Sequence, residues 1–138
     1  MTVTFEEFNQ ICLLSSEEAG KEYCLSAAKD AYALYSSGGN IGYEVVRRDG
    51  LIAGGAVLAT DRFCYKRPVG GIMHFYVFPE YRGTKVAAKL LKMCDNWFRD
   101  RNVSEIIASL TMDVDGNAAS FFKKLGYNKE IVTLIKEL

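Results

Sequence analysis

The sequence lacks the features that would indicate a membrane protein, a secreted protein or a nucleic-acid-binding protein. No apolar run approaches the roughly 20 residues that a membrane-spanning helix needs. Basic and acidic side chains balance at 17 each, so there is no basic excess for nucleic acid or an anionic membrane. The first seven residues contain neither the basic nor the apolar segment of a secretory signal. We therefore expect a cytoplasmic protein whose partners are neither nucleic acid nor membrane.

Metal-binding residue types are also scarce. The chain has one histidine, His74, and four cysteines with no C-x-x-C pair. A zinc site built from cysteine and histidine needs about four such ligands at close spacing, so we expect no metal. Cys12, Cys24 and Cys94 lie among apolar residues in helix-like patterns, which predicts buried free thiols.

The 138 residues are expected to form one domain, residues 1–138, of the α/β (α+β) class. The strongest local signals are Asp49-Gly50 between two apolar runs, which predicts a β-hairpin, and Gly126, which predicts a helix end. Ser15-x-x-Glu18 resembles a capping box and predicts that a helix begins there. The expected order is a helix over 5–14, a helix over 15–35, the hairpin strands 41–48 and 51–59, a strand over 71–78, a helix over 84–100, a strand over 105–112, a helix over 117–125 and a final strand over 127–137.

The turn between the strand that ends at Phe78 and the helix that follows has the chemistry of an anion site. The first backbone N–H groups of a helix have no intrahelical acceptor, and the helix dipole favours negative charge there. Small residues in such a turn let the backbone approach a pyrophosphate. On chemistry alone the signal is modest, because many α/β proteins have such units and bind nothing.

Two motifs make the indication more specific. Tyr76 to Gly83, Tyr-Val-Phe-Pro-Glu-Tyr-Arg-Gly, resembles the signature of the GNAT acetyltransferases, and the family's Arg/Gln-x-x-Gly/Ala-x-Gly/Ala pattern begins at Arg82. Phe121 to Tyr127 resembles the second landmark of that family. Together the motifs cover about residues 72–127. The resemblance implies a GNAT-like mixed central sheet, split between two central strands and flanked by helices.

The resemblance also implies an acetyl-CoA-dependent N-acetyltransferase, in which a primary amine attacks the acetyl group directly within a ternary complex. The donor would pair with the backbone of the central strand, and its pyrophosphate with the amides of the following turn. By this resemblance the cofactor-binding residues are Phe75, Tyr76, Val77, Arg82, Gly83, Thr84, Lys85, Val86, Ala87, Ala88, Asp115 and Phe122.

Two positions depart from the family pattern. Lys85 replaces a small residue of the turn, although its ammonium near a diphosphate would also be favourable. Phe122 stands where the family has the tyrosine that protonates the leaving thiolate, which a phenyl ring cannot do. These departures support an alternative, a catalytically weakened GNAT-fold binding or interaction module that still holds CoA.

The catalytic candidates are His74 and Tyr76, which alternate onto one side of the central strand. Packing is an equal alternative for His74, and the favoured one for Tyr76 and Tyr127. The acceptor remains open among a small-molecule amine, a protein N-terminus and a lysine side chain. An anionic acceptor for the basic loop 61–68 is less favoured than a solvated loop. Dimers are common in this family, so a homodimer is one option that the sequence does not decide.

Overall fold

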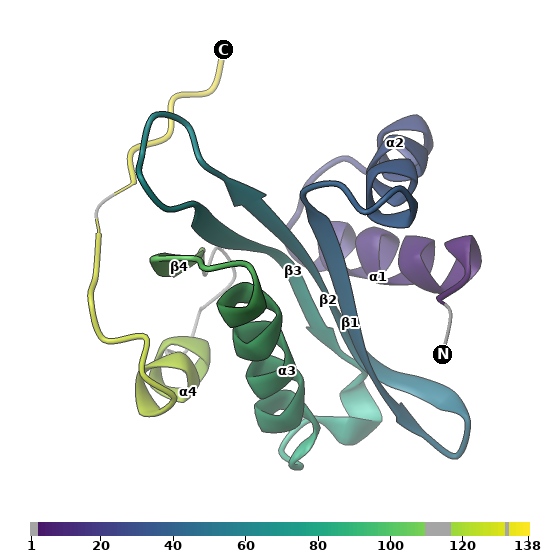
Figure 1. Cartoon of the computed structure of the whole chain (residues 1–138). Helices are drawn as coiled ribbons and strands as arrows, with labels where there is room; N and C mark the ends of the chain where they lie inside the picture. The colour runs from purple at the N-terminus through teal and green to yellow at the C-terminus, as the bar shows by residue number, and fades with distance from the viewer. Residues whose placement is uncertain (1–2, 110–116, 132) are drawn as a thin grey trace.

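The computed structural model describes residues 3–109, 117–131 and 133–138. Four strands form one sheet in the order β1-β2-β3-β4, with α1 and α2 on one face and α3 and α4 on the other (Figure 1). No helix within the described ranges is long and apolar enough to span a bilayer. The elements are α1 (Phe5–Glu18), α2 (Leu25–Ser36), β1 (Ile41–Arg48), β2 (Leu51–Asp61), β3 (Val69–Val77), the short 3-10 helix η1 (Pro79–Tyr81), α3 (Val86–Asp100), β4 (Glu105–Ala108) and α4 (Asn117–Lys124).

The sheet is mixed and split. β1, β2 and β3 are antiparallel, and the β1–β2 turn places Asp49 and Gly50 at φ 53° and 78°, as the Asp-Gly hairpin signal predicts. β4 pairs with β3 in parallel, and the last described pair is Ile72 with Ala108. β3 continues to Val77 beyond this pair, so among the described residues its second half pairs with β2 alone. This confirms the mixed sheet that the sequence predicts and locates the split.

The face covered by α3 is packed with aliphatic and aromatic side chains. Leu90, Leu91, Cys94 and Phe98 are almost completely buried on it, as the helical period of this segment predicts. The strands approach the helix closely, because a Cβ atom at Gly70 would lie 2.5 Å from the Phe98 ring. The sequence therefore fixes this layer through both the apolar stripe and a glycine.

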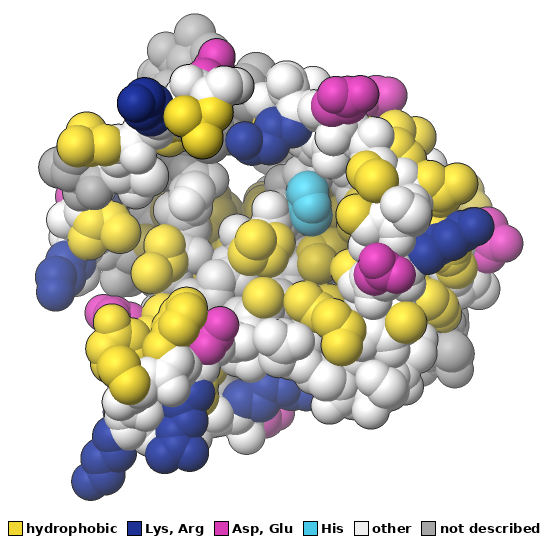
Figure 2. All heavy atoms as spheres, turned by 90° about the horizontal axis from the view of Figure 1, so that it is seen from above, with side chains coloured by type: hydrophobic (Ala, Val, Ile, Leu, Met, Phe, Trp, Pro, Cys, Tyr) yellow, Lys and Arg dark blue, Asp and Glu magenta, His cyan; other side chains and the backbone are white. Residues whose placement is uncertain are grey.

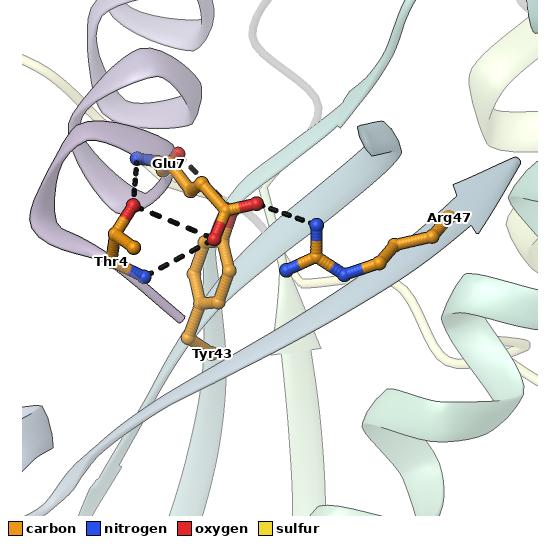
Figure 3. A network of polar contacts seen from close by, with 4 residues as sticks. All are labelled: Thr4, Glu7, Tyr43 and Arg47. Atoms are coloured by element: carbon orange, nitrogen blue, oxygen red, sulfur yellow. Dashed lines mark hydrogen bonds and ion pairs between the residues drawn. The ribbon is translucent and has the colours of Figure 1, made fainter. Parts of the chain in front are cut away.

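The opposite face, covered by α1 and α2, contains many aromatic rings with polar groups. Phe8 is fully buried, with its ring centroid 5.4 Å from that of Tyr32 and 5.3 Å from that of Tyr43. The Tyr43 hydroxyl donates to the Glu7 carbonyl, and the Arg47 guanidinium lies 2.6 Å from the Glu7 carboxylate (Figure 3). These contacts fasten α1 to β1.

The boundaries of the first two helices differ from the expectation. The capping box of α1 is formed by Thr4 and Glu7 rather than by Ser15 and Glu18 (Figure 3). α1 continues through Ser15 and stops where Gly20 adopts φ 68°, a conformation that favours glycine. α2 then begins after Cys24, which is exposed, so the prediction of a buried thiol is wrong for this cysteine and right for Cys12 and Cys94.

The expected final strand is also wrong for the residues that the structure describes. Residues 127–131 and 133–138 form no strand. The chain folds back onto α4 after Gly126, since the Tyr127 N–H bonds the Phe122 carbonyl and Glu130 pairs with Lys123 at 2.7 Å. These local contacts direct the chain along α4 instead of onto the sheet.

Candidate active site

A cavity of about 590 Å³ lies beside the split of the sheet. Its walls come from the end of α1, the ends of β2 and β4, most of β3 and one side of α4. Figure 2 shows the single histidine side chain beside a hollow with hydrophobic side chains around it. The cavity therefore brings together segments that are far apart in the sequence, and it contains both predicted catalytic residues, His74 and Tyr76.

The unpaired half of β3 divides its side chains between the two faces of the sheet. Tyr76 packs with the α1 side, whereas Phe75 and Val77 pack with the α3 side. A β-bulge precedes this stretch, because Val57 pairs with His74 and Leu58 with Ile72, which leaves Met73 as the extra residue. The backbone edge of Phe75, Tyr76 and Val77 thus faces the split, where the sequence predicts contacts to the donor.

The turn from β3 to α3 presents a group of free backbone donors. Gly83 adopts φ 79° and has open space around its α-carbon. The Thr84 hydroxyl donates to the Tyr81 carbonyl at 2.5 Å and accepts the Val86 N–H at 3.3 Å, so the first N–H of α3 has a partner. Within the described residues, the N–H groups of Gly83, Lys85, Ala87 and Ala88 have no acceptor.

The Lys85 side chain, the main departure from the pattern in this turn, is exposed. The turn thus combines free backbone donors with an exposed ammonium group, which is the kind of arrangement that binds anions.

Arg82 makes its contacts within the protein. Its Nε donates to the Val77 carbonyl at 2.8 Å, and a terminal nitrogen lies 2.9 Å from the Glu18 carboxylate. The guanidinium also lies over the Tyr76 ring at 5.2 Å from its centroid. Arg82 therefore links the end of β3 to the last turn of α1. Its backbone N–H also has a partner, the Pro79 carbonyl at 3.2 Å, so its predicted role in donor binding stays a prediction.

His74 is bonded to α1. Its Nδ1 lies 2.9 Å from the Ser15 hydroxyl oxygen, and the ring is half-buried. Burial lowers the pKa of His74 from its ordinary value near 6.5, because the charged imidazolium loses hydration. The neutral form therefore dominates at pH 7, and a neutral imidazole can accept a proton.

The second landmark places a phenyl ring where the family has a phenol. Phe122 is buried at the split, with its ring 5.6 Å from that of Phe75 and 5.2 Å from that of Tyr127. The Tyr127 hydroxyl donates to Asp95 at 2.8 Å, and burial together with this bond raises the pKa of Tyr127 far above its usual range. Tyr127 is thus a packing residue tied to α3.

The basic residues of loop 61–68 support the loop itself. Arg67 donates to the carbonyls of Asn102 and Val103, and the Arg62 Nε donates to the Tyr65 carbonyl. This arrangement weakens the case for an anionic acceptor at the loop. Asp115, a predicted donor-binding residue, lies outside the described residues. Within the described ranges, no group of three or more metal-ligating side chains comes together.

Sequence reasoning missed three features of the cavity. Ser15 is read as a cap from its local pattern, but it contacts a histidine 59 positions away. Met73 looks like one more apolar residue of a strand, and Phe63 like part of a solvated loop, yet both line the cavity. The bulge and the path of the loop, which place these residues, have no signature in the local sequence. An apolar residue in an otherwise polar loop is only a weak indication of a binding site.

Comparisons with known proteins agree with this geometry. A trypanosomal acetyltransferase from Trypanosoma brucei superposes with a TM-score of 0.74 at 19% identity, covering 100% of this chain and 97% of that one. An aminoglycoside acetyltransferase from an uncultured soil metagenomic sample, in complex with sisomicin, gives 0.74 at 15% identity, covering 97% and 90%. Glucosamine-6-phosphate N-acetyltransferase from Arabidopsis thaliana gives 0.71 at 15% identity, covering 99% and 95%.

At these identities the structural likeness shows the fold. No curated protein matches the sequence. The family model described as the Acetyltransferase (GNAT) family matches residues 5–127, which is most of the chain. The protein therefore belongs to the GNAT acetyltransferase family.

Proposed function

We propose that the protein is an N-acetyltransferase that moves the acetyl group of acetyl-coenzyme A onto a primary amine in a ternary complex. The observation that carries this proposal is the continuity of two open sites. The edge of β3 that has no strand partner beyond Ile72, as far as the structure describes the chain, leads directly into the turn with free N–H groups. An extended pantetheine arm followed by a diphosphate has the matching sequence of groups.

The residues of the turn fit the diphosphate of this donor. The N–H groups of Gly83, Lys85, Ala87 and Ala88 would donate to its oxygens, and the dipole of α3 favours the negative charge. Gly83 lets the backbone approach, since a side chain at its positive φ would be strained. The ammonium of Lys85 would add attraction from the solvent side.

His74 would be the general base. The amine nitrogen forms the new C–N bond with its lone pair while the C–S bond breaks, and the sulfur leaves with the bonding pair. The proton that the amine loses passes to the neutral imidazole and then to solvent. Nε2 would accept this proton in the tautomer in which Nδ1 carries the ring hydrogen and donates it to the Ser15 hydroxyl. Phe122 offers no proton, so the thiolate would take one from water.

Donor binding can be tested without knowing the acceptor. Titration calorimetry with acetyl-CoA should show saturable binding. Ala88 is exposed in the first turn of α3, so Ala88→Glu places a carboxylate beside the proposed diphosphate site while acidic residues there favour the helix. We expect at least about tenfold weaker binding, or about 1.4 kcal/mol.

Asn96→Glu is the matched control, because it adds the same charge two turns further along α3 on another exposed position. It should bind acetyl-CoA like the unmodified protein. No binding of acetyl-CoA at millimolar concentration would refute the proposal, as would equal affinity in the two variants.

A second candidate function is a GNAT-fold module that binds CoA without turnover. The observation in its favour is the loss of the phenol at Phe122, together with the engagement of Tyr127 by Asp95. Release of free CoA thiol in the presence of an amine separates the two. Amine-dependent release supports the transferase, whereas binding without release across an amine panel supports the module.

A further inference from the structure

Exposed apolar side chains line the same cavity as His74. Phe63, Met73 and Ile107 are 75%, 60% and 41% exposed, and all three line the cavity. They come from the loop after β2, from the bulge of β3 and from β4. Single exposed apolar residues are common on protein surfaces, but a convergent group in a cavity marks a binding site.

The charges in the same cavity are few and largely balanced. The Glu18 carboxylate pairs with Arg82 at 2.9 Å. Asp61 accepts the Phe63 N–H at 2.9 Å, and Lys21 contributes one ammonium group. A polycation would need several uncompensated carboxylates, and a sugar phosphate would need several cationic or N–H donors. The described walls match neither pattern.

We propose that the acceptor is a small primary amine whose single ammonium group is attached to an apolar body. The body lies against Phe63, Met73 and Ile107, and the nitrogen points toward His74. The cavity volume of about 590 Å³ is in the range of small-molecule sites and is shared with the reactive end of the donor. This inference rests on the proposed function and narrows its acceptor.

The mode of binding also explains the position of the bulge. Met73 is the residue of β3 that has no partner in β2, so its side chain is free to face the cavity immediately before His74. An apolar group of the acceptor that contacts Met73 would therefore lie close to the proposed base, because His74 is the next residue of the chain. Apolar contact would therefore orient the amine without a charged anchor, and the ammonium would lose its proton more easily in an apolar wall than beside a carboxylate.

The test is an acceptor panel with acetyl-CoA, measured as release of CoA thiol. We expect kcat/KM for phenethylamine and isopentylamine to exceed that for ethanolamine, spermidine and glucosamine 6-phosphate by at least about tenfold. A preference for spermidine, for the sugar phosphate or for a peptide with a free N-terminus would overturn the inference while leaving the transferase intact.

The variant Phe63→Ala removes one wall of the cavity at an exposed loop position, so the fold is retained. We expect its KM for phenethylamine to rise about three- to tenfold, with KM for acetyl-CoA and for ethanolamine unchanged. Leu51→Ala is the matched control, because Leu51 is equally exposed, at 73%, and lies at the β1–β2 hairpin away from the cavity. Equal effects of the two variants would overturn the inference.

A measurement independent of turnover separates this inference from the function it rests on. His74 is the sole histidine, so its imidazole signal in a magnetic resonance spectrum needs no assignment. Phenethylamine should shift this signal saturably, and Phe63→Ala should weaken that binding about three- to tenfold. No shift at millimolar amine would overturn the acceptor class even if acetyl-CoA binds, whereas failure of acetyl-CoA to bind would overturn the proposed function.

Discussion

The two faces of the sheet are built from different side chains, although the same strands supply both. On the face covered by α3, Leu90, Leu91 and Phe98 form an apolar layer. On the face covered by α1, His74 bonds Ser15 and Glu7 pairs with Arg47. Alternation along β3 contributes to the difference, because Phe75 and Val77 pack on the α3 side whereas Tyr76 packs on the α1 side. It teaches that a single strand can join an apolar layer to a polar one.

The stability of the apolar layer under α3 should be sensitive to added side-chain volume. Gly70→Ala would place a Cβ atom 2.5 Å from the almost completely buried ring of Phe98. We expect a loss of about 1–3 kcal/mol in the free energy of unfolding, measured by urea denaturation. Gly71→Ala, the next residue, would meet only the Met73 sulfur at 3.6 Å and should be neutral or slightly stabilising. Equal losses in the two variants would contradict the close approach of β3 to α3.

The polar face should be sensitive in turnover rather than in stability. Ser15→Ala removes the partner of the His74 Nδ1 and replaces a helical serine by a better helix former. We expect kcat to fall by about tenfold because the imidazole loses its fixed orientation, with KM for acetyl-CoA and the urea midpoint unchanged.

Two further variants test whether the expected fall in kcat depends on the hydrogen bond between Ser15 and His74. Ser16→Ala changes the neighbouring residue, which also lines the cavity, and should leave kcat unchanged. Ser15→Thr retains a hydroxyl and should restore most of the rate. If Ser15→Ala and Ser16→Ala behave alike, the hydrogen bond does not position His74.

The smallest effect is expected at the ion pair that fastens α1 to β1. The bond to Arg47 is the main reason that the pKa of Glu7 lies below its usual range. The stabilisation is therefore fully present above the pKa of the unfolded chain and is lost as the pH falls through the lower pKa of the folded protein. Glu7→Gln should cost about 1 kcal/mol or less at pH 7.

The pH dependence of the free energy of unfolding shows whether the Glu7–Arg47 ion pair causes the loss of stability in Glu7→Gln. Between about pH 5 and pH 3, the unfolding free energy of the unmodified protein should fall more steeply than that of Glu7→Gln. Glu6→Gln removes the same charge from the same turn of α1 and should keep the steep fall. Parallel curves for Glu7→Gln and the unmodified protein would show that the pair does not contribute.

The same division explains which parts of the fold the sequence could predict. The α3 layer depends on local information, namely a long apolar stripe, and so do the Asp49-Gly50 turn and the helix end at Gly126; these predictions are confirmed. Helix boundaries on the other face depend on competition between two similar signals. The capping box at Thr4 forms, whereas the pattern at Ser15 lies inside a helix that Gly20 ends.

The site was predictable to the extent that it is contiguous in sequence. The strand and turn from His74 to Ala88 lie where the motif predicts. The contacts of His74 and Arg82 to Ser15 and Glu18, 59 and 64 residues away, could not be predicted, because the pattern that contains these two partners indicates only a local helix cap. The wall formed by Phe63 and Met73 was missed for the same reason, since a bulge and a loop path place it.

The most direct test of the account is the pH dependence of kcat/KM for amine acetylation in the unmodified protein and in His74→Ala. We expect the rate of the unmodified protein to rise with pH through an ionisation below pH 6.5, where His74 loses its proton. In His74→Ala this rise should disappear and the rate should be about 100-fold lower. An unchanged profile in the variant would contradict the account, because His74 would then be a packing residue of the polar face.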